Sequence, residues 1–151
     1  MSPSLSHSIV RVLLVEDSWG DALLMRQALR DANLPFHLSI VTDGEDALAF
    51  LNHEGKYSGS SQPDLVVLDL NLPRMDGRVF LRRAKESPLF QNLPIVILTS
   101  SQLDSDIREV QGLNADSYMV KPTDLNGFLR VARNLWDFWF KWKALSPSGE
   151  H

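Results

Sequence analysis

Apolar and polar positions alternate along this chain of 151 residues in two kinds of segment. Short runs rich in Val, Ile and Leu are apolar at nearly every position, which is typical of strands buried on both faces of a parallel sheet. The second run, FHLSIV, is more polar, and we expect it at an edge of the sheet. The predicted strands are residues 11–15, 36–41, 65–69, 94–99 and 117–120.

Longer amphipathic segments separate these runs and predict helices. Ser18 and Asp21 have the spacing of a capping box, and Asp43 and Asp124 stand where they can cap later helices. The predicted helices are residues 18–32, 43–51, 77–85, 104–112 and 124–142. The alternation predicts an α/β fold, a doubly wound (βα)5 unit around a five-stranded parallel sheet. We expect one domain at residues 9–142, with short tails at 1–8 and 143–151.

Composition narrows the function classes. Forty-four per cent hydrophobic and 23% charged residues are ordinary for a globular protein, and the net charge of −4 offers no basic surface for nucleic acid. The absence of cysteine excludes disulfides and thiolate metal sites. No stretch reaches the roughly 18 apolar residues that a membrane span requires. We therefore expect a cytoplasmic protein without nucleic-acid or membrane partners.

Reactive side chains follow four of the five predicted strands. Glu16 and Asp17 come after the first strand, Asp69 ends the third, Thr99 ends the fourth, and Lys121 follows the fifth. In an open parallel sheet, ligands bind beyond the carboxyl ends of the strands. Each residue alone has an ordinary structural role, such as helix capping, but together they form a coherent site.

The chemistry of that set points to phosphoryl transfer. Three crowded carboxylates repel one another unless they share a cation or a proton, and an oxygen-rich acidic cluster suits Mg²⁺. A single carboxylate, Asp69, can act as nucleophile toward phosphorus. The cation, the Lys121 ammonium and the Thr99 hydroxyl can then stabilise charge on the phosphoryl oxygens.

The chain resembles the receiver domain of two-component response regulators. The matching pieces are LLVEDS, DLVVLDLNLPRMDG, PIVILTSS and SYMVKP, in receiver order and at receiver spacing. The resemblance implies the receiver strand order 2-1-3-4-5 and a partner histidine kinase. EDSWGDALL, SDIREVQGLNADSYMVKP and LWDFWF are most similar to the stand-alone regulators that partner bacterial phytochromes, so the implied kinase is a bacteriophytochrome.

The resemblance also implies roles for individual residues. Asp69 is then the phosphoacceptor and Asp17 a direct Mg²⁺ ligand, while Glu16 holds the ion through water and the backbone carbonyl of Asn71 is a further ligand. The only catalysis implied is of the protein's own phosphorylation and dephosphorylation.

Signal output is implied in the same way. Thr99 would swing toward the phosphoryl group, and Tyr118 would turn inward on the fifth strand. The face of the fourth helix, fifth strand and fifth helix would change as a result. The resemblance further implies a cis peptide bond between Lys121 and Pro122.

Three other functions fit the same fold. A flavodoxin-like carrier needs a phosphate-binding loop after the first strand, where this chain has acids. A haloacid-dehalogenase-type phosphatase usually places a second Asp two residues after its nucleophile, where this chain has Asn71. A phosphate-independent scaffold has no need of the complete set of acids, Thr and Lys.

The last predicted helix carries an unusually wide apolar surface. One line of residues, including Trp136, Trp139 and Phe140, is expected to pack on the sheet. A second line follows the spacing of a helix–helix seam. This second line predicts a homodimer about a two-fold axis through Val131, Leu135, Phe138 and Trp142.

Overall fold

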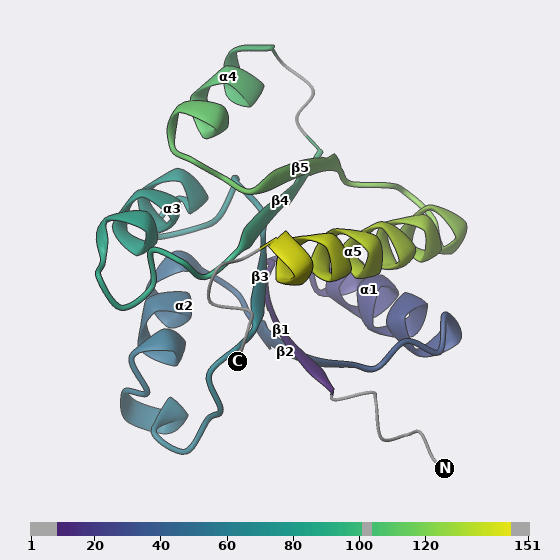
Figure 1. Ribbon diagram of the computed structural model, residues 1–151, viewed down its shortest axis with the longest axis horizontal. Coiled ribbons are helices and arrows are strands. Elements are labelled where there is room, and N and C mark those ends of the chain that lie inside the picture. The colour runs from purple at the N-terminus through teal and green to yellow at the C-terminus, as the bar shows by residue number, and fades with distance from the viewer. Residues whose placement is uncertain (1–8, 101–103, 146–151) are drawn as a thin grey trace.

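A single parallel sheet forms the centre of the molecule (Figure 1). This computed structural model describes residues 9–100 and 104–145. The five strands are paired in the order β2-β1-β3-β4-β5, all parallel, which confirms the predicted fold class and places β2 at an edge. The strands are β1 (Val10–Val15), β2 (Phe36–Val41), β3 (Leu65–Leu68), β4 (Ile95–Thr99) and β5 (Ser117–Val120).

The helices begin and end close to the predicted residues. Ser18 caps the first, accepting a hydrogen bond from the backbone N–H of Asp21 at 3.2 Å, and Asp43 caps the second in the same way through Asp46. The last helix continues past the predicted domain end at residue 142. The helices are α1 (Trp19–Asp31), α2 (Gly44–Leu51), α3 (Gly77–Glu86), α4 (Asp104–Gly112) and α5 (Leu125–Leu145), with a 3₁₀ turn, η2 (Gly55–Tyr57).

Two apolar layers enclose the sheet. Helices α1 and α5 lie side by side on one face, and α2, α3 and α4 lie on the other (Figure 1). Successive side chains of β1 enter different layers: Leu13 and Val15 pack toward α2 and α3, whereas Val12 and Leu14 pack toward α1 and α5. Because both faces are covered, β3 is apolar at all of its positions, and β1 and β4 are apolar at all but one.

The predicted dimer seam on α5 is wrong for half of its residues. Val131 and Leu135 are 6% and 1% exposed and belong to the core. Phe138 and Trp142 are half-buried, and Phe140, which was expected to face the sheet, is 67% exposed. The reason is that α1 packs along α5, so the sheet and a neighbouring helix together bury a wider arc than the sheet alone would.

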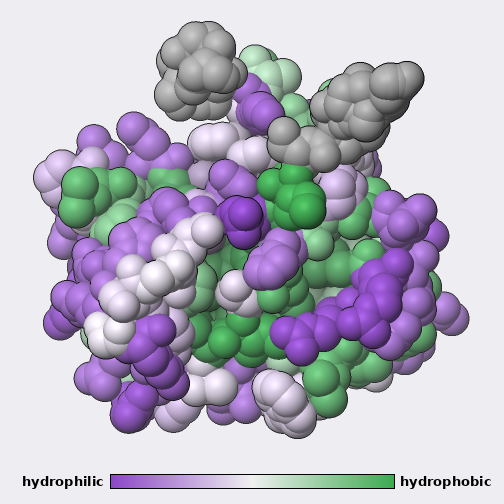
Figure 2. Space-filling model, turned by 90° about the horizontal axis from the view of Figure 1, so that it is seen from below, coloured by the Kyte–Doolittle hydropathy of each residue, from purple (hydrophilic) through white to green (hydrophobic). Residues whose placement is uncertain are grey.

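Aromatic contacts fix the second half of α5. The Trp136 ring meets Phe36 of β2 edge-on at 5.7 Å between centroids, and Trp139 stacks on Trp142 at 5.5 Å. Figure 2 looks onto the β2 edge of the sheet and shows apolar surface in a hollow between polar side chains. Within the described part of the chain, no helix is long and apolar enough to cross a membrane.

Candidate functional site

Hydrogen bonds just beyond the strands bring the candidate residues to one edge of the sheet. The backbone N–H of Asp69 donates to Val15 at 3.1 Å, and that of Lys121 donates to Thr99 at 2.8 Å. These bonds continue the parallel ladders one residue past β3 and β5. The side chains that the sequence placed at strand ends therefore come together as expected.

Asp69 is the centre of the site. It is 5% exposed, and three donors converge on its carboxylate. The Thr99 hydroxyl donates to Oδ1 at 2.9 Å, the backbone N–H of Asn71 donates to the same oxygen at 3.2 Å, and the Lys121 ammonium donates to Oδ2 at 3.0 Å. Thr99 is fully buried, so its hydroxyl has a fixed direction. Three hydrogen bonds thus fix the carboxylate in a place where few water molecules reach it.

Lys121 contacts three carboxylates. Its Nζ lies 2.8 Å from Glu16 Oε1, 3.0 Å from Asp69 Oδ2 and 3.1 Å from Asp21 Oδ2, and its side chain is only 10% exposed. Burial lowers the pKa of this ammonium, but the hydrogen bonds to Glu16 and Asp69 outweigh that effect and raise the pKa above its ordinary value. Lys121 is therefore a fixed positive charge beside Asp69.

Two of these carboxylates, Glu16 and Asp69, also lie close to the exposed Asp17. Single oxygens of Glu16, Asp17 and Asp69 all lie within 4.8 Å of one another. Burial raises the pKa of Glu16, although hydrogen bonds from Lys121 and from the Ser18 N–H lower it in part. Asp17 is exposed, so a cation could keep several water molecules while bound. These hard oxygen donors fit Mg²⁺ or Mn²⁺.

The loop after β3 is packed against the site. A Cβ atom at Gly77 would lie 2.3 Å from the Asp69 carbonyl oxygen and 2.8 Å from Leu70 Cα, so only glycine fits there. Arg74, at a φ of 59°, turns its guanidinium onto the buried Asp43 carboxylate. The end of the loop that carries Asn71 thereby packs against its start, and Arg74 within the loop ties it to the cap of α2.

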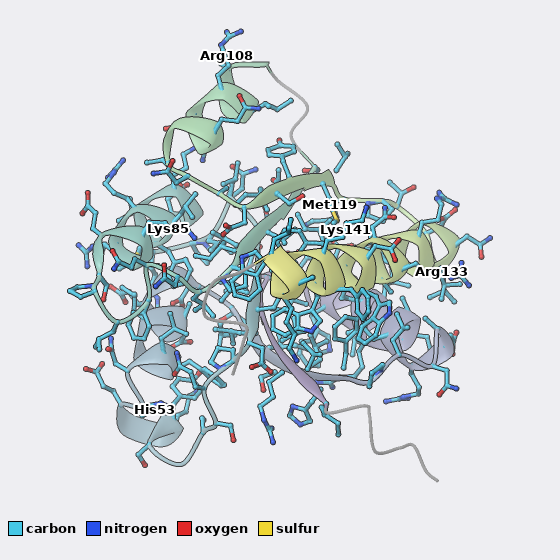
Figure 3. The ribbon with its side chains drawn as sticks, in the orientation of Figure 1. His53, Lys85, Arg108, Met119, Arg133 and Lys141 are labelled. Carbon is cyan, nitrogen blue, oxygen red and sulfur yellow. The ribbon has the colours of Figure 1, made fainter. Side chains whose placement is uncertain are left out.

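Two further expectations concern Tyr118 on β5 and the peptide bond that follows Lys121. Tyr118 is half-buried and packs against the layer of α2 and α3, whereas Met119 faces α5 on the side of the sheet opposite Lys85 (Figure 3). The expected cis bond between Lys121 and Pro122 is wrong: residues 9–100 and 104–145 contain no cis peptide. An X–Pro bond prefers trans by only about 0.5–1 kcal/mol, so the sequence alone does not fix its isomer.

The site contains contacts that the sequence did not reveal. Asp21 was predicted only as part of a capping box, and its contact with Lys121 joins residues 100 positions apart. Asp43 was predicted only as a helix cap, and its pairing with Arg74 was missed. No local pattern points to these two contacts. The close packing of Gly77 against Asp69 does have a signal in the sequence, because a glycine just after a helix cap such as Asp76 often permits a close approach of backbones.

Known proteins are similar to this chain over most of its length. The family described as the response regulator receiver domain matches residues 12–133. Response regulator Rcp1 of Synechocystis sp. is 35% identical over 130 residues, covering 86% of this chain and 88% of Rcp1. The probable methanogenesis regulatory protein FilR2 of Methanothrix harundinacea is 34% identical, covering 87% of this chain and 84% of FilR2.

Solved structures of response regulators have a fold similar to that of this chain. The phosphorylated cyanobacterial phytochrome response regulator RcpA has a TM-score of 0.81 at 34% identity, covering 88% of this chain and 95% of RcpA. The Mn²⁺-bound form of Rcp1 has a TM-score of 0.78 at 35% identity, covering 86% and 94% of the two chains. With its strand order, its acidic cluster and these matches taken together, the chain belongs to the response regulator receiver domain family.

Proposed function

We propose that this protein takes a phosphoryl group onto Asp69 from the phosphohistidine of a partner kinase and passes the signal on through α4, β5 and α5. The observation that carries the proposal is the Asp69 carboxylate itself. It is buried, it directly follows the central strand β3, and it receives hydrogen bonds from Thr99, Lys121 and the Asn71 backbone.

The transfer needs a nucleophile and charge stabilisation. An oxygen of Asp69 attacks phosphorus, the new O–P bond forms as the P–N bond breaks, and the electron pair remains on the histidine nitrogen, which takes a proton from solvent. The Lys121 ammonium and the Thr99 hydroxyl are already within hydrogen-bond distance of Asp69, so they can follow the charge onto the phosphoryl oxygens.

Mg²⁺ is the cation we assign to the acidic cluster. Glu16, Asp17 and Asp69 would hold it, together with the backbone carbonyl of Asn71. When bound, the cation supplies positive charge that offsets the repulsion between these carboxylates and an incoming phosphoryl donor. The hard oxygen donors of the cluster support this assignment, as does the Mn²⁺ in the Rcp1 structure.

Signal output is assigned to the Thr99–Tyr118 pair. Thr99 is bound to Asp69 and would move with a new phosphoryl group. Tyr118 lies on the neighbouring edge strand and is half-buried, so it has room to change its exposure. A local change of charge at Asp69 would thereby alter the α4–β5–α5 surface.

A phytochrome-type histidine kinase in the cytoplasm is the partner we propose. The support is the similarity to RcpA, whose structure is described as a phytochrome response regulator. The phosphatase alternative needs an acid two residues after Asp69, and Asn71 supplies none. A phosphate-independent scaffold would not need Lys121 buried beside Asp69.

A second copy of the chain is the partner we propose for the end of α5. Phe140 and Leu145 are 67% and 83% exposed there. In an isologous contact the same patch on both copies would be buried. Phe140→Glu with Leu145→Glu should convert dimer to monomer in light scattering, and a native protein that is monomeric with and without phosphorylation would contradict the proposal.

Acetyl phosphate with Mg²⁺ tests the proposed function directly. The native protein should gain one acid-stable, hydroxylamine-labile phosphoryl group by mass spectrometry. Asp69→Asn, a nearly isosteric change, should gain none while keeping its cooperative unfolding. Asp31→Asn, an exposed acid on α1, is the matched control and should behave as native. Uptake by Asp69→Asn at the native rate would refute the assignment.

A further inference from the structure

Asp21 is a partner of Lys121 that the proposed chemistry does not use. Its Oδ2 lies 3.1 Å from Lys121 Nζ, almost as close as the Asp69 oxygen at 3.0 Å. An ammonium has three N–H donors, and here three carboxylates, those of Glu16, Asp21 and Asp69, account for all of them. Any phosphoryl oxygen that binds Lys121 must therefore share or replace one of these contacts.

The start of α1 explains why Asp21 is directed at Lys121. In a capping box, the acid at this position accepts the N–H of the capping residue. Here the Ser18 N–H donates instead to Glu16 Oε2 at 3.0 Å, while the Ser18 hydroxyl still accepts from the backbone of Asp21 at 3.2 Å. Half of the capping box is thus formed, and the Asp21 carboxylate lies against the ammonium.

The three carboxylates that contact Lys121 differ in their other neighbours and in their exposure. Glu16 and Asp69 also belong to the acidic cluster that faces the cation, whereas Asp21 is not among the carboxylates grouped there. Asp21 is also the most exposed of the three, at 30%, against 3% and 7% for the side chains of Glu16 and Asp69. Asp21 can therefore hold Lys121 without giving up a cation ligand.

We propose that Asp21 is a positioning residue that divides the Lys121 ammonium between the cation-binding carboxylates and the phosphoryl group. The inference rests on the proposed function of Asp69. By drawing the ammonium toward α1, Asp21 weakens its hold on Glu16 and Asp69 and leaves them freer for the cation. The same contact occupies a donor that a phosphoryl oxygen would otherwise receive.

Removing the Asp21 charge should change cation affinity and phosphoryl-group affinity in opposite directions. A merely structural role would not produce this pattern. Without the Asp21 charge, Lys121 binds Glu16 and Asp69 more firmly, so the cation should bind less tightly. At saturating cation, the released N–H donor should make a phosphoryl-like anion bind more tightly. A variant that only loosened the site would weaken both.

Asp21→Asn, which is nearly isosteric, tests the proposal. Mn²⁺ affinity is measured by electron paramagnetic resonance of the free ion, and affinity for beryllium trifluoride at saturating Mg²⁺ is measured by fluorine NMR. We expect Mn²⁺ to bind about fivefold more weakly and the beryllium complex about fivefold more tightly, the size of a partly exposed charge contact. Asp137→Asn, an exposed acid in the second half of α5, should move neither constant.

A Lys121→Ala background completes the experiment. If Asp21 acts through Lys121, adding Asp21→Asn to Lys121→Ala should give no gain in beryllium trifluoride affinity. A gain that persists there, two constants that move in the same direction, or an unmoved constant in the single variant would each overturn the inference. A native protein that binds no beryllium trifluoride would overturn the proposed function, and this inference with it.

Discussion

Replacing Lys121 with methionine should destabilise the protein in a way that a divalent cation reverses. The side chain is 10% exposed and neutralises Glu16 and Asp69, whose side chains are 3% and 7% exposed. Removing one partner of a buried ion pair costs about 3–5 kcal/mol. We expect a value near the lower end, about 3 kcal/mol at pH 7, because Ser18 and Thr99 still donate to these carboxylates.

The loss should also depend on pH. Burial already raises the pKa of Glu16 above its ordinary value of 4.5, and removing the Lys121 hydrogen bond raises it further. A carboxyl whose pKa is higher in the folded state binds more protons when folded. Its contribution to stability is therefore fully present below the unfolded value and lost as the pH rises through the folded value. The deficit of Lys121→Met should shrink as the pH falls from 7 toward 4.5.

Urea unfolding in EDTA and in Mg²⁺ measures both effects. Binding to the folded state adds about 2.7 kcal/mol when the free cation is at 100 times its dissociation constant. Without the competing ammonium, Lys121→Met should bind Mg²⁺ more tightly than the native protein, so its deficit relative to the native protein should narrow in Mg²⁺. Lys85→Met is the matched control, since the Lys85 side chain is similarly little exposed, at 12%, and lies 2.7 Å from Asp116, but on α3 and outside the acidic cluster (Figure 3).

The control variant should bind Mg²⁺ like the native protein, so its deficit relative to the native protein should be the same in EDTA and in Mg²⁺. Native stability of Lys121→Met in EDTA, or an equal Mg²⁺ response in the two lysine variants, would refute the view that Lys121 neutralises a buried cation-binding cluster.

Other substitutions test neighbouring parts of the structure. Asp17→Ala should raise stability in EDTA and weaken Mn²⁺ binding, because it removes one of three crowded carboxylates; a loss of stability in EDTA would contradict that crowding. Leu135→Ala should cost about 2–5 kcal/mol in urea unfolding, whereas Phe140→Ala should cost far less, and equal costs would contradict the burial pattern of α5. Gly77→Ala should cost about 1–3 kcal/mol and slow uptake of the phosphoryl group, because its Cβ meets the backbone at Asp69; native behaviour in both assays would argue against that contact.

Local patterns in the sequence determined the elements and the main site residues. Apolar runs located the central strands to within a residue or so, because a strand covered on both faces is largely apolar, and the more polar run at residues 36–41 located the edge strand. Ser18 and Asp43 marked helix starts, since their side chains satisfy backbone N–H groups a few residues away. Polar residues at strand ends then predicted Asp69 and Lys121 at one edge, because parallel strands all end there.

Contacts between distant segments were decided only by the tertiary structure. Val131 and Leu135 are buried because α1 packs along α5, and nothing in the periodicity of α5 shows which neighbour covers its second apolar line. Asp21 reaches Lys121 because α1 starts beside the end of β5, which sequence spacing does not encode. The Lys121 ammonium likewise contacts three carboxylates only because the folded chain brings all three within 3.1 Å of its Nζ atom.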